Sequence, residues 1–175
     1  MHTATSIRKI EDICKNGKID VPDEAGVYAF WWIGNRDELL SANRHIVLKG
    51  PGQKLVDVEF KDWWPQELQF PCLYVGKSTN LKKRFSLHLK RGSTGRLHQI
   101  PLSNEKQKAV TTSCQVRYGI EHVFNCHSNP LDIINERVGF SFTTNFPEDA
   151  IAERFYTEDR LIGIWRPWFN VDSER

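Results

Sequence analysis

The sequence Leu73-Tyr74-Val75-Gly76-Lys77-Ser78-Thr79-Asn80-Leu81-Lys82-Lys83-Arg84-Phe85-Ser86-Leu87-His88-Leu89 decides how this chain is organised. It begins as a short apolar strand, Cys72 to Val75, and a turn at Gly76 follows, because glycine permits a tight backbone path. The free amides at the start of the next helix can be satisfied by a polar side chain, from Ser78, Thr79 or Asn80. The pattern therefore predicts a strand, a turn and a helix.

The predicted helix and its flanks are basic. The chain has no acidic residue between Leu68 and Asn104, and seven bases fall in this interval: Lys77, Lys82, Lys83, Arg84, Lys90, Arg91 and Arg96. Arg84 and His88 are four residues apart and are therefore neighbours on one face of the helix. The formal net charge is only +2, so the distribution of charge, rather than its total, favours a polyanionic partner.

The tripeptide Gly76-Lys77-Ser78 also imitates the end of a phosphate-binding P-loop. That motif requires a glycine five residues before Gly76, where this chain has Pro71, which has no amide hydrogen. A P-loop is therefore rejected.

A second strand-like segment lies earlier in the chain, at Gly26-Val27-Tyr28-Ala29-Phe30. Together with Leu73-Tyr74-Val75-Gly76, it resembles the two half-motifs of the GIY-YIG nuclease family. The resemblance continues in order and spacing through Lys77, Asn80, Leu81, Arg84 and His88, and again through Glu158-Asp159-Arg160-Leu161-Ile162 and Arg166-Pro167-Trp168-Phe169-Asn170. It covers a core of about residues 22–32, 71–91 and 137–171.

The resemblance implies an α+β fold, in which helices flank a central, mainly antiparallel sheet of three strands. We expect a single domain over residues 1–175, with the third core strand at 138–144 and an N-terminal helix at about 5–16. Two insertions are expected, at about 33–70 and 92–136. The first contains a plausible hairpin, 45–48 and 55–60, around Gly50-Pro51-Gly52.

The last helix is predicted to begin at an Asn145 cap, with Glu148 as the capping-box partner. A period of 3.6 residues places four apolar side chains on one face, namely Ile151, Phe155, Ile162 and Trp165. Glu158 falls on that same face, whereas Glu153 falls on the opposite, solvent-facing side. An unpaired carboxylate would be costly there, so Glu158 must meet an arginine, a lysine or a metal ion.

By its resemblance, the chain is expected to be a divalent-metal-dependent DNA endonuclease. Glu158 would hold one Mg²⁺ or Mn²⁺ ion, which needs few protein ligands because it keeps several waters. Arg84 would contact the scissile phosphate with its planar, charged fork. Tyr28 would orient or deprotonate the attacking water, and Tyr74 would point toward the same cleft.

Three further catalytic positions follow from the resemblance: Lys77, His88 and Asn170. His88 would accept or relay a proton, and Asn170 would position a side chain or a phosphate by hydrogen bonding. Lys77 is an alternative general base, and the sequence does not decide among tyrosine, histidine and lysine. A free phenol has a pKa near 10, so nearby cations, Lys77 or Arg84, would have to favour the phenolate.

The expected partner is DNA, and the pattern does not separate DNA from RNA. Lys82, Lys83, Lys90 and Arg91 are predicted to line the nucleic-acid path. Specificity would come from the two insertions, as in compact type II restriction enzymes of the family, which cut palindromes with two active sites in a homodimer or by sequential nicks. A structure-specific or phage-related nuclease fits equally well. The alternative from another class is a catalytically inactive nucleic-acid-binding module on the same scaffold.

The remaining features predict a cytoplasmic protein with reduced thiols. The longest nearly apolar segment, Gly26 to Gly34, is too short to span a membrane. The cysteines show no CxxC spacing, and the spacing of Cys114, His122, Cys126 and His127 fits no standard zinc site. We expect four tryptophans to pack together in the core: Trp31, Trp32, Trp63 and Trp64.

Overall fold

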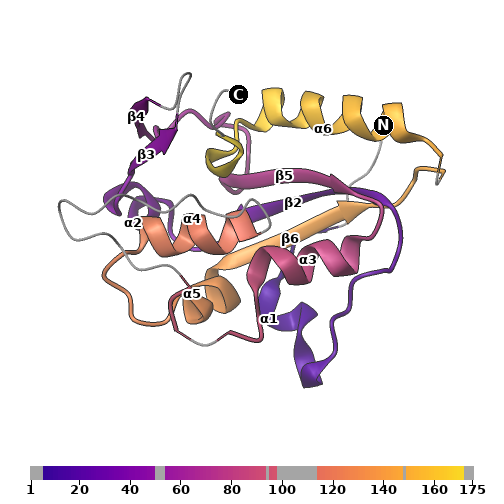
Figure 1. Ribbon diagram of the computed structural model, residues 1–175, viewed down its shortest axis with the longest axis horizontal. Coiled ribbons are helices and arrows are strands. Elements are labelled where there is room, and N and C mark those ends of the chain that lie inside the picture. The colour runs from indigo at the N-terminus through magenta and orange to yellow at the C-terminus, as the bar shows by residue number, and fades with distance from the viewer. Residues whose placement is uncertain (1–5, 50–53, 94, 98–113, 148, 172–175) are drawn as a thin grey trace.

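The computed structural model describes residues 6–49, 54–93, 95–97, 114–147 and 149–171 (Figure 1). Its strands are β1 (Arg8–Lys9), β2 (Gly26–Trp32), β3 (His45–Lys49), β4 (Leu55–Glu59), β5 (Cys72–Ser78) and β6 (Val138–Thr143). Its α-helices are α1 (Ile10–Ile13), α2 (Arg36–Ser41), α3 (Leu81–Leu89), α4 (Gln115–Val123), α5 (Pro130–Arg137) and α6 (Ile151–Trp165). Two 3₁₀ turns accompany them, η1 (Lys15–Gly17) and η4 (Trp168–Asn170).

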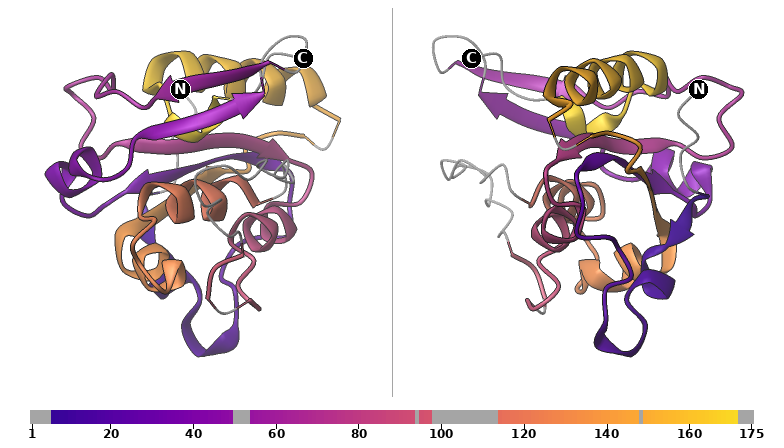
Figure 2. Two further views of the ribbon diagram at one scale, coloured as in Figure 1. Left: turned by 60° about the vertical axis from the view of Figure 1, so that its left-hand side comes forward. Right: turned by 90° about the vertical axis from the view of Figure 1, so that its right-hand side faces the viewer.

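The main sheet has four antiparallel strands in the order β1-β6-β2-β5, and β3 and β4 form a separate hairpin. The predicted α+β class, the antiparallel sheet and the inserted hairpin are therefore confirmed, and the two motif strands, β2 and β5, are neighbours in that sheet. Figures 1 and 2 show α6 beside the edge strand β5, with α3, α4 and α5 together on the other side of the sheet. No helix in the described ranges is long and apolar enough to cross a membrane.

The N-terminal segment differs from the helix predicted over residues 5–16, of which residue 5 lies outside the described ranges. Arg8 and Lys9 instead pair with Phe140 and Gly139 of β6, which adds a fourth strand to the three expected. Only one turn of helix, α1, follows. Ile10 and Ile13 of this turn are buried, whereas pairing with β6 overrode the helical propensity of the residues before them.

Trp31, Trp32 and Trp64 are buried in the core and Trp63 packs against it, as expected, but the prediction that the four rings pack on one another is wrong. Successive residues of a strand point to opposite faces. Trp31 accordingly packs on Trp165 of α6, with ring centroids 4.7 Å apart, whereas Trp32 stacks on Phe124 at 5.2 Å. Trp64 stacks instead on Trp168 at 4.5 Å.

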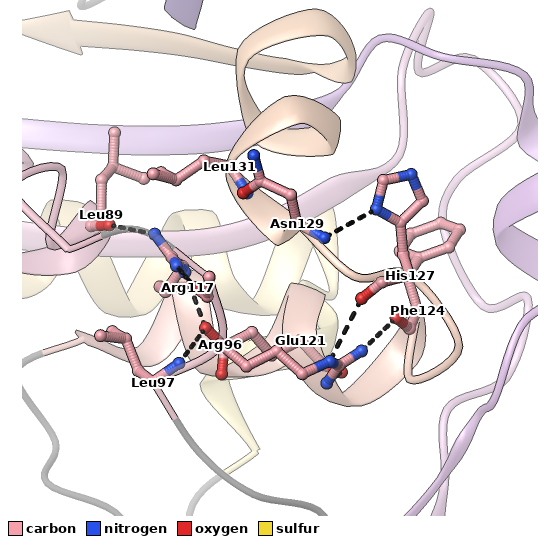
Figure 3. Close-up of polar contacts among 10 residues, drawn as sticks. Leu89, Arg96, Leu97, Arg117, Glu121, Phe124, His127, Asn129 and Leu131 are labelled. Carbon is pink, nitrogen blue, oxygen red and sulfur yellow. Dashed lines mark hydrogen bonds and ion pairs between the residues drawn. The ribbon is translucent and has the colours of Figure 1, made fainter.

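The described part of the second insertion folds as α4 and α5, which fix the position of α3. Arg117 of α4 is fully buried and donates through Nε to Glu121 Oε1 at 2.7 Å and through Nη1 to the Leu89 carbonyl oxygen at 3.3 Å (Figure 3). The Leu97 amide donates to the same Glu121 oxygen at 2.9 Å. Because its hydrogen bonds are made, this buried ion pair ties the end of α3 to α4 without leaving an uncompensated charge.

The last helix begins later than predicted. α6 starts at Ile151 after Ala150, which makes no side-chain cap, and the expected capping partner Glu148 lies outside the described ranges. Arg154 donates to the Pro147 carbonyl oxygen at 3.0 Å and so closes the loop before the helix. Ile151 and Phe155 are 60% and 50% exposed, so the prediction of a continuous buried stripe is wrong at this end of the helix.

Gly76 lies inside a strand rather than in the predicted turn, since β5 continues to Ser78. It pairs with Tyr28 of β2. A Cβ atom at this position would meet the Tyr28 hydroxyl oxygen at 2.4 Å and a Tyr74 ring carbon at 2.8 Å. Glycine is therefore required here because two tyrosine rings cover the backbone.

We predict that Gly76→Ala destabilises the fold by about 1–3 kcal/mol, because the added methyl group must displace buried rings. Urea denaturation of the wild type and the variant measures this change. Gly163→Ala is the matched control, since Gly163 is an exposed helical residue where an added methyl group would meet nothing within 4 Å, and alanine there should stabilise by up to about 1 kcal/mol. Equal stability of Gly76→Ala and wild type would contradict the close approach.

Candidate active site

The centre of the candidate site is a buried contact between β2 and α3. The Tyr28 hydroxyl and His88 Nε2 are 2.7 Å apart, and the two side chains are 2% and 0% exposed. Tyr74 completes the group, with its ring centroid 4.7 Å from that of His88 and 6.1 Å from that of Tyr28. Even-numbered positions of the paired strands thus bring both motif tyrosines to the side of the sheet that α3 covers.

Helix α3 supplies His88 and Arg84 from one face, as the sequence predicted. Of the three possible caps, Asn80 is the N-cap, and its side chain accepts a hydrogen bond from the Lys83 amide at 2.8 Å. Leu81, Phe85 and Leu89 are buried and hold the helix against the sheet. Arg84 is partly buried and close enough to Tyr28 and His88 to influence the pKa of each.

Burial keeps this pair neutral. It lowers the pKa of His88 from 6.5 to about 3, and the positive charge of Arg84 acts in the same direction. Burial also raises the pKa of Tyr28 well above its ordinary value; Tyr74 and Glu158 add to this, whereas Arg84 opposes it. Arg84 therefore acts in the direction expected of a cation that favours the phenolate, but in the free protein desolvation outweighs it.

The second ring nitrogen of His88 indicates which tautomer the pair adopts. Nδ1 is buried and has no hydrogen-bond partner among the described residues. A proton on Nδ1 would be a buried donor without an acceptor, which is more costly than an unfilled lone pair. The neutral ring is therefore best placed with its proton on Nε2, donating to the Tyr28 oxygen. The hydroxyl proton of Tyr28 is then free to point at another acceptor.

Glu158 meets a cation, as predicted, and that cation is Lys77. The Lys77 amide donates to Glu158 Oε1 at 3.1 Å, and the Lys77 ammonium contacts Oε2. Glu153, on the opposite side of α6, is exposed as expected. Glu158 is close enough to Tyr28 to contribute to its raised pKa, so the carboxylate and the tyrosine belong to one electrostatic group.

Asn170 lies at the same sheet edge but acts on the backbone. Its Oδ1 accepts from the Val75 amide at 2.7 Å, and its Nδ2 donates to the Val75 carbonyl oxygen at 2.8 Å. These two bonds imitate the pairing of a neighbouring strand. Asn170 was expected to position a side chain or a phosphate, and that expectation did not identify β5 as its partner.

The basic residues divide into exposed and structurally engaged groups. Lys82 and Lys83 are exposed at the start of α3, and Lys90 is partly exposed at its left-handed C-cap. Arg91 Nη1 donates to Asn135 Oδ1 at 2.6 Å.

Arg96 donates to the carbonyl oxygens of Glu121, Phe124 and His127, two of which are drawn in Figure 3. Arg96 is therefore engaged in closing the end of α4.

Phe155 is a further residue at the site, although its helical spacing had predicted a place in the core. Its ring centroid is 3.6 Å from the Lys77 ammonium nitrogen. The only sequence signal for this position was its spacing of three residues before Glu158, which puts both side chains on one side of α6.

The acidic residues present fit a metal ion only if water supplies most of its ligands. No group of three or more His, Cys, Asp or Glu side chains gathers in the ranges that the structure describes. A carboxylate has about four lone-pair positions, and Mg²⁺ readily keeps several waters, so it needs few ligands from the protein. A hydrated ion on one carboxylate therefore fits. None of the four cysteines, all of which the structure describes, forms a disulfide, and the Cys114, His122, Cys126 and His127 side chains form no such group.

Comparisons of this chain with models of protein families, with curated proteins and with solved structures found no match.

We predict that Asn170→Ala destabilises the protein by about 1–3 kcal/mol, because it leaves the amide and carbonyl of Val75 without partners at the sheet edge. Urea denaturation and the hydrogen-exchange rate of the Val75 amide measure the effect, and that amide should exchange faster. Asn145→Ala, at an exposed position, is the control and should change neither quantity. A stable Asn170→Ala protein with a slowly exchanging Val75 amide would refute the edge-sealing role.

Proposed function

We propose that this chain is a divalent-metal-dependent endonuclease that hydrolyses DNA phosphodiester bonds, and that it is a compact relative of the GIY-YIG nucleases. The observation that carries the proposal is the convergence of Tyr28, Tyr74, Arg84 and His88 from three separate elements. Glu158 lies 130 positions after Tyr28 in the chain (158 minus 28), and it contributes to the raised pKa of the Tyr28 phenol.

Each residue of the site has a task in the proposed reaction. Arg84 would bind the non-bridging oxygens of the scissile phosphate, since its charge is permanent and its donors form a planar fork. Tyr28 would hold the attacking water through its hydroxyl, while His88 Nε2 fixes the orientation of the phenol. A divalent ion on Glu158 would supply positive charge for the phosphate and for the departing alkoxide.

The neutral Tyr28–His88 pair restricts how the water can lose its proton. With a pKa of about 3, His88 is a weak base at pH 7, and Tyr28 retains its own proton. Tyr28 therefore orients the water in the free protein, and deprotonation requires that bound phosphate and cation change the electrostatics of the site.

The second candidate function is an inactive nucleic-acid-binding module. Two observations favour it: the Tyr28–His88 pair is neutral, and Glu158 already has a cation in Lys77. Exposed Lys82 and Lys83 would serve this function equally well. Cleavage of DNA in the presence of a divalent ion separates the two candidates.

We predict that the protein nicks or cuts plasmid DNA in Mg²⁺ or Mn²⁺, and that Glu158→Gln slows cleavage at least about a hundredfold, because one charge at the reacting phosphate is no longer stabilised. Single-turnover assays measure the rate. Glu153→Gln removes the same charge from an exposed position on the same helix and should cut at the wild-type rate. If the wild type binds DNA tightly but leaves it intact with every divalent ion tested, the binding module is the correct function.

We predict that the bases of α3 separate into binding and catalytic residues. Lys82→Ala or Lys83→Ala should weaken DNA binding for all sequences and reduce the salt slope by about one unit for each lost phosphate contact. Arg84→Ala should mainly slow turnover, because the charge it meets grows in the transition state. Binding at several salt concentrations, beside single-turnover cleavage at saturation, distinguishes them. A saturated Arg84→Ala enzyme that cuts at the wild-type rate would make Arg84 only a clamp.

A further inference from the structure

The ammonium group of Lys77 is held from two sides by α6. Glu158 Oε2 contacts it directly, and the Phe155 ring centroid is 3.6 Å from its nitrogen. The side chains of Lys77 and Glu158 are 25% and 13% exposed, so this ion pair is more protected from solvent than a typical surface pair. Attraction to the ring face adds to the attraction of the carboxylate.

This contact gives a reason for the exposure of Phe155. The ring is 50% exposed although it is large and apolar, and it lies one helical turn before Glu158. In this position the Lys77 ammonium packs against one face of the ring. Phe155 is thus placed to hold Lys77 on the carboxylate rather than to fill the core.

The same carboxylate is the proposed ligand of the divalent ion. Oε2 faces the ammonium, and Oε1 accepts the Lys77 amide hydrogen at 3.1 Å. A divalent ion on Oε2 would lie a few ångströms from a like charge, a repulsion that is strong in a partly buried setting. The ion and the ammonium therefore compete for one position.

We propose that Lys77 is an internal cation that occupies the metal position of Glu158 in the free protein, and that a divalent ion binds by displacing it. This inference rests on the proposed function, because it takes Glu158 as the metal ligand. The exchange needs no movement of the sheet, since the four-carbon stem of Lys77 is flexible and the hydrogen bond that its backbone amide donates to Glu158 Oε1 can remain. The released ammonium stays beside the site, where it can form an ion pair with an anionic phosphate.

Binding of Mn²⁺ without DNA tests the exchange, measured by calorimetry or by the loss of the free-ion electron paramagnetic resonance signal. Lys77→Met should bind Mn²⁺ about tenfold more tightly than the wild type, because the competitor is gone. Phe155→Leu should tighten binding by a smaller factor, because the ammonium is less firmly held. Lys77→Arg keeps the competing charge and should show no tightening.

Lys82→Met is the matched control, since it removes the same charge from an exposed position in the nearby helix. It shows how far the loss of one positive charge by itself changes the affinity for Mn²⁺. The proposal is overturned if Lys77→Met binds Mn²⁺ no more tightly than Lys82→Met. Circular dichroism establishes that each variant folds. If Lys77→Met does not fold, the Mn²⁺ affinity of Phe155→Leu is compared with that of Lys82→Met instead.

Glu158→Gln separates this inference from the proposed function. If Glu158→Gln loses Mn²⁺ binding and Lys77→Met does not bind Mn²⁺ more tightly, the exchange is refuted, but Glu158 remains the proposed metal ligand. Unchanged Mn²⁺ binding in Glu158→Gln would instead refute Glu158 as the ligand, and with it both the exchange and the metal-dependent part of the proposed function.

Discussion

The register between β2 and β5 is the constraint on which the candidate site depends. Tyr28 is paired with Gly76, and the absence of a Cβ atom at Gly76 lets the tyrosine ring lie across the edge strand. The hydroxyl then reaches His88 of α3 at 2.7 Å. A shift of one residue would turn every side chain of β5 to the other face and would remove Tyr74 from the side of the sheet that α3 covers. The strand register that packs the sheet therefore also positions the side chains of the site.

The outer edge of β5 explains how the last helix joins the site. An edge strand presents unpaired amides and carbonyls, which in many proteins invite association with another chain. Here Asn170 engages both backbone groups of Val75, and Glu158 accepts the amide hydrogen of Lys77. The two C-terminal residues that the resemblance singles out thus also protect the sheet. A structural and a chemical role coexist at Glu158, because a carboxylate has more lone pairs than these contacts engage.

The structure separates the seven bases of the basic segment into those with partners within the protein and those that are exposed. Arg96 closes the end of α4, Arg91 bonds to α5, and Lys77 pairs with Glu158, so these bases have partners within the protein. Lys82 and Lys83 remain exposed beside Arg84. Lys90 is partly exposed at the other end of this helix, so the exposed bases among the seven lie at the two ends of α3.

The sequence by itself determined the features that depend on local periodicity and on residue type. It predicted β2, α3 and β6, the inserted hairpin, the grouping of Arg84 with His88, and the need of Glu158 for a cation, because spacing along a helix or strand sets which side chains share a face. Only the tertiary structure decided that β1 replaces the start of the first helix, that Gly76 lies under a tyrosine, and that the cation is Lys77. These outcomes depend on contacts between residues far apart in the chain, such as Arg8 with Phe140 and Lys77 with Glu158, and no local pattern encodes them.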